Sequence, residues 1–99
     1  MLADWVERHT SEAPAALRTR VQQHVMAADG GPTVPAALAR AARQALDQVL
    51  THPGDRSVAL DLLAADALIT LALLAQAQRA PEGLSEFAGS ILHSVRPDA

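Results

Sequence analysis

The sequence predicts an all-α domain: a compact bundle of four to five helices around one central apolar helix at about Ser57 to Arg79. Two observations predict this fold. Hydrophobic residues make up 49% of the chain and are mostly Ala and Leu, which favour helices, whereas β-branched and aromatic residues are few. Apolar residues also recur at spacings of three and four between breaks that contain Gly and Pro. A length of 99 residues predicts a single domain, residues 1–99.

The first two helices are predicted at residues 2–9 and 12–28. Thr10 or Ser11 is predicted to cap the second helix, because a side-chain oxygen at that position accepts a hydrogen bond from the first turn. The second helix should end at the sequence Asp29-Gly30-Gly31-Pro32, since Gly accepts the left-handed backbone of a helix end and Pro cannot continue a helix.

The third and fifth helices are predicted at residues 34–51 and 83–95. Thr33 is predicted to cap the third helix, which has one apolar stripe and an opposite face rich in Arg and Gln. Gly89 lies inside the fifth helix, where Gly costs about 1 kcal/mol relative to Ala. That cost is tolerable if Gly89 lets another helix approach closely.

The fourth helix is predicted at residues 56–79, with Asp55 as its cap and Pro81 just beyond its end. It differs from the others because apolar side chains point in nearly every direction around it. From Val58 to Ala75 the only polar residues are Asp61, Asp66 and Thr70. A helix that is apolar all round is buried on all sides, so it should form the centre of the bundle or lend part of its surface to another chain.

This helix is not predicted to cross a membrane. Its apolar stretch of about 18 residues is near the lower limit for a spanning helix. However, the stretch contains two aspartates, and a charged group at the bilayer centre costs at least about 2.5 kcal/mol. Its ends also lack aromatic belts and clustered basic residues.

Asp66 and Thr70 are the sharpest candidate site residues, because they lie one helical turn apart among apolar neighbours. A desolvated carboxylate must find a partner or take up a proton. Asp66 is predicted to pair with Arg40 or Arg43, or to reach solvent through a seam between helices. Asp61 lies about 140° around the helix from Asp66, and it is predicted to be a solvated residue near the helix start, where a carboxylate suits the helix dipole.

No catalytic residue, metal site or cofactor is predicted. The four histidines are widely separated, and none has another histidine one turn away: they are His9, His24, His52 and His93. The sequence also contains no Glu-x-x-His pair of the kind that binds iron in helical bundles. His24 interrupts an apolar face and is predicted to be a half-buried core residue. The absence of Cys excludes thiolate metal sites and disulfides.

Charge argues against a nucleic-acid partner. The formal net charge is −3, and the eight basic side chains, all Arg, are dispersed along the chain, whereas phosphate binding needs clustered positive charge. The first residues show no basic region followed by an apolar run, so no secretory signal is predicted. Together with the absence of Cys, this predicts a cytoplasmic protein.

Three hypotheses for the function follow. The first is a small non-enzymatic interaction protein that buries its apolar fourth helix in a homodimer or against a protein partner. The alternative is a helical bundle that binds a small apolar ligand, with Asp66 and Thr70 as polar anchors. An enzyme that uses Asp66 as a general base is the third hypothesis, although the sequence offers no partner residues for it.

Overall fold

The computed structural model describes residues 2–28, 30–52, 54 and 56–94. All regular structure in this part of the chain is helical, which confirms the predicted all-α bundle. The elements are α1 (Leu2–His9), α2 (Ala15–Ala27), α3 (Val34–Thr51), α4 (Ser57–Arg79), the 3-10 turn η1 (Pro81–Gly83) and α5 (Leu84–Ser94). The predicted Asp55 cap and the proposed last residue of the fifth helix, Val95, lie outside the described residues.

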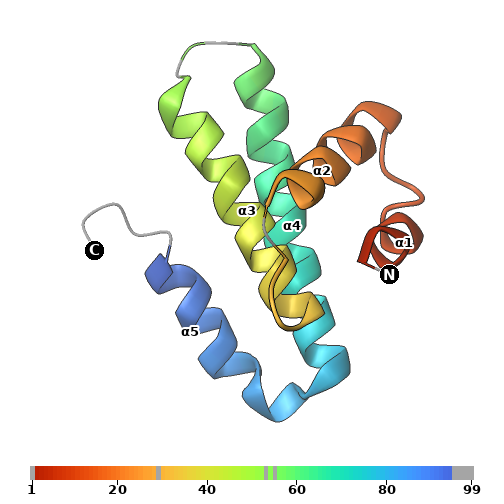
Figure 1. The fold of residues 1–99 in the computed structure, drawn as a ribbon, viewed down its shortest axis with the longest axis vertical. Coiled ribbons are helices and arrows are strands. Elements are labelled where there is room, and N and C mark those ends of the chain that lie inside the picture. Colours follow the sequence, from red (N-terminus) through yellow and green to blue (C-terminus); the bar gives the residue numbers. More distant parts are fainter. Residues whose placement is uncertain (1, 29, 53, 55, 95–99) are drawn as a thin grey trace.

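The long helices α3 and α4 run side by side in opposite directions and form the centre of the fold (Figure 1). Helices α1 and α2 lie on one side of this pair, and α5 lies on the other. Small side chains dominate the interior between α3 and α4, which lets the two helices pack at short distance. The fully buried or nearly buried alanines are Ala37, Ala41, Ala42, Ala45, Ala64, Ala65, Ala72 and Ala75.

Helix starts follow local chemistry. Thr33 caps α3 as predicted, because its Oγ1 accepts a hydrogen bond from the backbone N–H of Ala36 at 3.3 Å. The predicted start of the second helix was wrong: α2 begins at Ala15. Pro14 disfavours the helical region for the residue before it, and Pro14 itself has an extended backbone as the N-cap of α2. The Thr10 hydroxyl donates instead to the Val6 carbonyl at 2.8 Å and closes the end of α1.

Helix α4 is central, as predicted, and part of its surface is exposed in the single chain. Its inner side is fully buried, with Ala64, Leu68 and Ala72 at 0% exposure. Its outer side carries Leu62 at 53% and Leu63 at 56% exposure. The reason is geometric: α2, α3 and α5 contact α4, but these neighbours leave the outward face of its first half uncovered.

Gly89 does not serve a close approach within the chain, contrary to expectation. A Cβ atom built on Gly89 meets no other atom within 4 Å. The backbone there has room for a side chain, so the described part of the chain itself gives no reason for glycine at this position.

Gly31, by contrast, is required by packing at the start of α3. A Cβ at Gly31 would lie 2.8 Å from the Ala36 Cβ and 2.9 Å from the Ala37 backbone nitrogen, whereas a Cβ at Gly30 meets nothing within 4 Å. We therefore expect Gly31→Ala to lower the free energy of unfolding by roughly 1–3 kcal/mol, because the backbone must shift to relieve the overlap. Gly30→Ala is the matched control, with an expected change within about 0.5 kcal/mol. Urea unfolding at one protein concentration measures both, and equal effects would contradict the packing argument.

Candidate functional site

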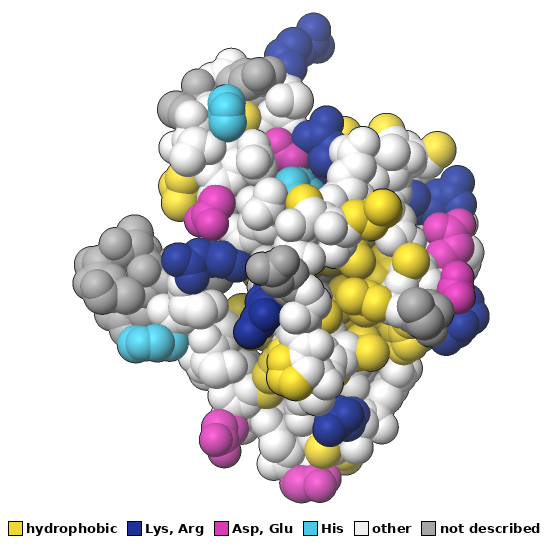
Figure 2. Space-filling view, viewed as in Figure 1, with side chains coloured by type: hydrophobic (Ala, Val, Ile, Leu, Met, Phe, Trp, Pro, Cys, Tyr) yellow, Lys and Arg dark blue, Asp and Glu magenta, His cyan; other side chains and the backbone are white. Residues whose placement is uncertain are grey.

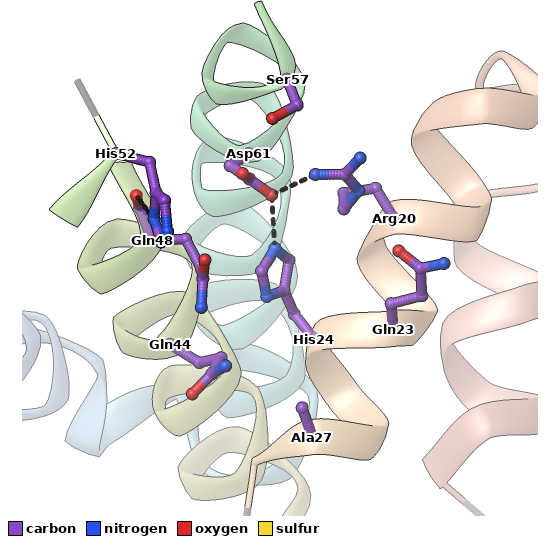
Figure 3. A pocket seen from close by; sticks show the side chains of 9 residues that line it. All are labelled: Arg20, Gln23, His24, Ala27, Gln44, Gln48, His52, Ser57 and Asp61. Atoms are coloured by element: carbon purple, nitrogen blue, oxygen red, sulfur yellow. Dashed lines mark hydrogen bonds and ion pairs between the residues drawn. The ribbon is translucent and has the colours of Figure 1, made fainter. Parts of the chain in front are cut away.

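A buried ionic cluster joins α2 to α4. The Asp61 Oδ1 atom of α4 accepts a hydrogen bond from Arg20 Nη1 at 2.6 Å and contacts His24 Nε2 at 2.9 Å (Figure 3). Arg20 and His24 are four residues apart on α2, a spacing that places both side chains on one face of a helix. The α2 face with these two side chains therefore lies against the start of α4, and the cluster clamps the two helices together.

The surroundings of Asp61 favour its ionised form. Its side chain is only 8% exposed, beside 7% for His24 and 26% for Arg20. Burial alone raises the pKa of Asp61, but the hydrogen bonds and charges of Arg20 and His24 outweigh burial and hold the pKa below its ordinary value of 3.8. An ionised carboxylate accepts a hydrogen bond and cannot donate one, so His24 carries a proton on Nε2.

A polar pocket of about 340 Å³ opens beside this cluster, between α2, α3 and α4. Figure 3 shows Gln44 and Gln48 of α3, and His52 just beyond its end, on the wall opposite α2. Besides the cluster, the pocket is lined by Gln23, Ala27, Gln44, Gln48, His52 and Ser57. A His–Asp pair can orient a general base, but here Arg20 shares the same carboxylate oxygen and neutralises it. We interpret the cluster as a structural ion pair.

The two aspartates of α4 lie in opposite environments. Asp61, predicted to be solvated, is 5% exposed as a whole residue, so this prediction was wrong. Asp66 is exposed, which agrees with the predicted alternative in which it reaches solvent. His24 is also more buried than predicted, at 5% exposure. Asp61 shares the buried face of α4 with Ala64 and Leu68, three and seven residues further on. Asp66 has the same spacing to Ile69 and Leu73, so spacing alone does not distinguish the two aspartates.

The predicted partners of Asp66 bind elsewhere. Arg40 Nη1 donates to the Gly30 carbonyl at 3.1 Å. Arg43 Nη1 donates to the Ser94 carbonyl, and its Nε lies 3.5 Å from the carboxylate of Asp47 on the same helix. Arg40 therefore binds the segment that precedes α3, and Arg43 links α3 to the end of α5. Neither arginine forms the predicted ion pair with Asp66.

Asp66 and Thr70 do lie together, on the outer face of α4. Both are exposed, and the Thr70 hydroxyl donates to the Asp66 carbonyl at 3.0 Å. They line a pocket of about 330 Å³ between α4 and the α1–α2 connection, with His9, Thr10, Glu12, Ala13, Ala67 and Leu71. This lining is more polar than the apolar pocket that the sequence predicted.

Apolar side chains continue along the outer face of α4 on both sides of Asp66. Leu62 and Leu63 precede it, and Leu74, 40% exposed, follows it. Beside this row, α4 and α5 enclose a pocket of about 220 Å³ whose lining is entirely apolar: Ile69, Leu73, Ala88, Ile91 and Leu92. Leu92 at its rim is 65% exposed. We call the exposed leucines of α4 and this pocket the α4 outer surface.

Figure 2 shows one face of the molecule. Hydrophobic side chains gather near the centre of this face, and Arg, Asp and Glu side chains lie in small separate groups over the rest of it. The Arg side chains on this face do not form one continuous basic patch of the kind that tracks phosphates.

By length and composition alone, α4 is apolar enough to cross a membrane. Its most apolar 18-residue window has a mean hydropathy of 2.1, and 39% of that window is buried inside the protein. The buried share packs against α2, α3 and α5 as a core helix does. That α4 does not cross a membrane stays a prediction.

In the described residues no group of three or more His, Asp or Glu side chains could hold a metal ion. Comparisons with protein-family models, with curated proteins and with solved structures find no match for this chain. Two features thus stand out as candidate sites. The ionic cluster around Asp61 forms its hydrogen bonds within the chain, whereas the leucines of the α4 outer surface are exposed.

Proposed function

We propose that this chain is a small non-enzymatic interaction protein that forms a homodimer through the α4 outer surface. The observation that carries the proposal is the exposure of Leu62 and Leu63, at 53% and 56%, on the helix that forms the centre of the core. Full burial of a leucine side chain is worth roughly 1.5–3 kcal/mol, so covering this surface is favourable. The sequence led to the same hypothesis by a different route, since it predicted that α4 is too apolar to be left uncovered.

A second copy of the chain suits this surface chemically. The α4 outer surface offers leucines near both ends of a stretch whose middle carries one carboxylate, Asp66, and one hydroxyl, Thr70. Two such surfaces can place leucines against leucines. The Thr70 hydroxyl can donate to the partner's Asp66 carboxylate once it turns from the Asp66 carbonyl of its own helix. A self-complementary patch of this kind is what a two-fold symmetric dimer requires.

Light scattering on a size-exclusion column tests the proposal. We expect the wild-type chain, 10.4 kDa as a monomer, to have twice that mass at micromolar concentration. Leu63→Glu should reduce it to the monomer mass while its circular dichroism stays helical, because residue 63 is exposed in the single chain. Leu50→Glu is the matched control. Leu50 is 71% exposed on α3 and is not part of the α4 outer surface, so its replacement should leave the dimer intact.

Two outcomes would overturn the homodimer. One is a wild-type chain that stays monomeric at all concentrations. The other is a chain that floats with phospholipid vesicles and fails to do so after Leu63→Glu, because the α4 outer surface would then bind lipid and not a second copy.

Binding of a small molecule beside Asp66 and Thr70 is the second candidate function. The pocket of about 330 Å³ that contains both residues favours it. Native mass spectrometry of the purified protein tests it: a retained small molecule that is lost in Asp66→Asn would support ligand binding. A spectrum of protein alone in both samples counts against it.

A further inference from the structure

We infer that two copies pair their α4 helices antiparallel about a two-fold axis that crosses the outward face at the height of Leu68, and that each inserts Leu62 into the apolar α4–α5 pocket of the other. This inference rests on the proposed homodimer and specifies its geometry. Two independent observations on α4 carry it: the symmetry of the outward residues in the sequence, and the position of the pocket.

The outward residues of α4 read alike in both directions from Leu68. Leu62-Leu63 stand six and five residues before it, and Leu73-Leu74 stand five and six residues after it. Asp66 is two residues before it, and Thr70 is two residues after it. In an antiparallel pair, residues equally far from the two-fold axis lie at the same height, so leucines meet leucines and Asp66 lies beside the partner's Thr70.

The helical rotation agrees with this register. At about 100° per residue, Leu62 and Leu73 lie about 20° apart around α4, and so do Leu63 and Leu74. Each pair therefore shares one edge of the outward face. A two-fold axis brings like edges together, so Leu62 packs against the partner's Leu73, and Leu63 packs against the partner's Leu74. A parallel pair would instead place Asp66 against the partner's Asp66, where like charges repel.

The α4–α5 pocket lies at the position where this register places the partner's Leu62. Leu73 lines the pocket of about 220 Å³ and, in the inferred register, lies beside the partner's Leu62. All five lining side chains are apolar, so the pocket offers water no hydrogen-bond partner and suits an aliphatic occupant. By symmetry the same contact forms twice. Each dimer thus has two leucines inserted in two pockets.

Cysteine cross-linking tests the register, and the absence of native Cys means that every thiol is an introduced one. The variants Asp66→Cys and Thr70→Cys are prepared separately and then mixed under mild oxidation. We expect the mixture to form disulfide-linked dimers at least several-fold faster than either variant alone. The reason is that residue 66 and the partner's residue 66 are offset by about 6 Å of helix rise in addition to the gap between helices. A disulfide requires Cα atoms within about 4.4–6.8 Å.

Leu62→Ala tests the pocket. We expect it to raise the dimer Kd by about 100-fold, because two buried leucines are lost per dimer. Leu50→Ala, at an exposed position outside the α4 outer surface, should leave the Kd unchanged. Efficient cross-linking of Asp66→Cys with itself, or a Kd that Leu62→Ala does not change, would overturn this geometry while a dimeric mass still supports the proposed function. A monomeric wild-type chain would overturn both.

Discussion

Asp61→Ala is expected to lower the free energy of unfolding by about 3 kcal/mol, because it leaves one partner of a buried ion pair without its counter-charge. The Asp61 carboxylate is 8% exposed and is shared by Arg20 and His24, so its removal strands two polar groups at once. A domain of this size is stable by only about 5–15 kcal/mol, so the loss is a large share of the total. Urea unfolding followed by circular dichroism at neutral pH measures it.

Asp47→Ala is the matched control for this prediction. It also removes an aspartate carboxylate, but from an exposed position on α3 where its contact is a surface ion pair with Arg43, and should change the stability by less than about 0.5 kcal/mol. Acidification provides a second check. Because the pKa of Asp61 is lowered in the folded protein, its stabilising contribution is present above pH 3.8 and is lost as the pH falls through the folded value. The wild type and Asp61→Ala should therefore converge in acid; a constant difference would contradict the ion pair as the cause.

Leu68→Ala is expected to lower the free energy of unfolding by about 2–5 kcal/mol, since it leaves a cavity at the centre of the core. Leu68 is 0% exposed on the inner side of α4, between α-helical neighbours that are largely alanine and cannot close the space by rotating larger side chains into it. Chemical unfolding at one protein concentration measures the loss. Leu50→Ala removes the same atoms from a position that is 71% exposed on α3 and should cost less than about 1 kcal/mol. Comparable losses in the two variants would contradict the assigned inner side of α4.

Local sequence signals predicted the helices well. The bounds of α1 and α3 agree with the predicted residues 2–9 and 34–51, and Thr33 is the cap that its chemistry suggested. The prediction of where α2 starts failed because Thr10 and Pro14 give competing signals. Proline disfavours a helical backbone at the residue before it, and this effect outweighs the capping preference of Thr10. Signals of this kind act over a few residues, so they can be weighed from the sequence alone.

The environment of the aspartates could not be predicted in the same way. A helix that is apolar all round carries no pattern that tells which side faces the core, so the burial of Asp61 could not be predicted and the two alternatives for Asp66 stayed open. Only the placement of α2 decides between them, and that placement depends on contacts between residues far apart in the chain, such as His24 with Asp61. The four-residue spacing of Arg20 and His24 indicates a shared binding face only once Asp61 is known to be their partner.

The exposed leucines on the outward face of α4 give the homodimer its most direct test. Thermal unfolding of the wild-type chain is measured over a wide range of protein concentration. Because a dimer dissociates when it unfolds, we predict a Tm that rises steadily with concentration, and a Leu63→Glu variant whose Tm is constant. A wild-type Tm that does not depend on concentration would contradict the claim that the outer surface of α4 is covered by a second copy of this chain.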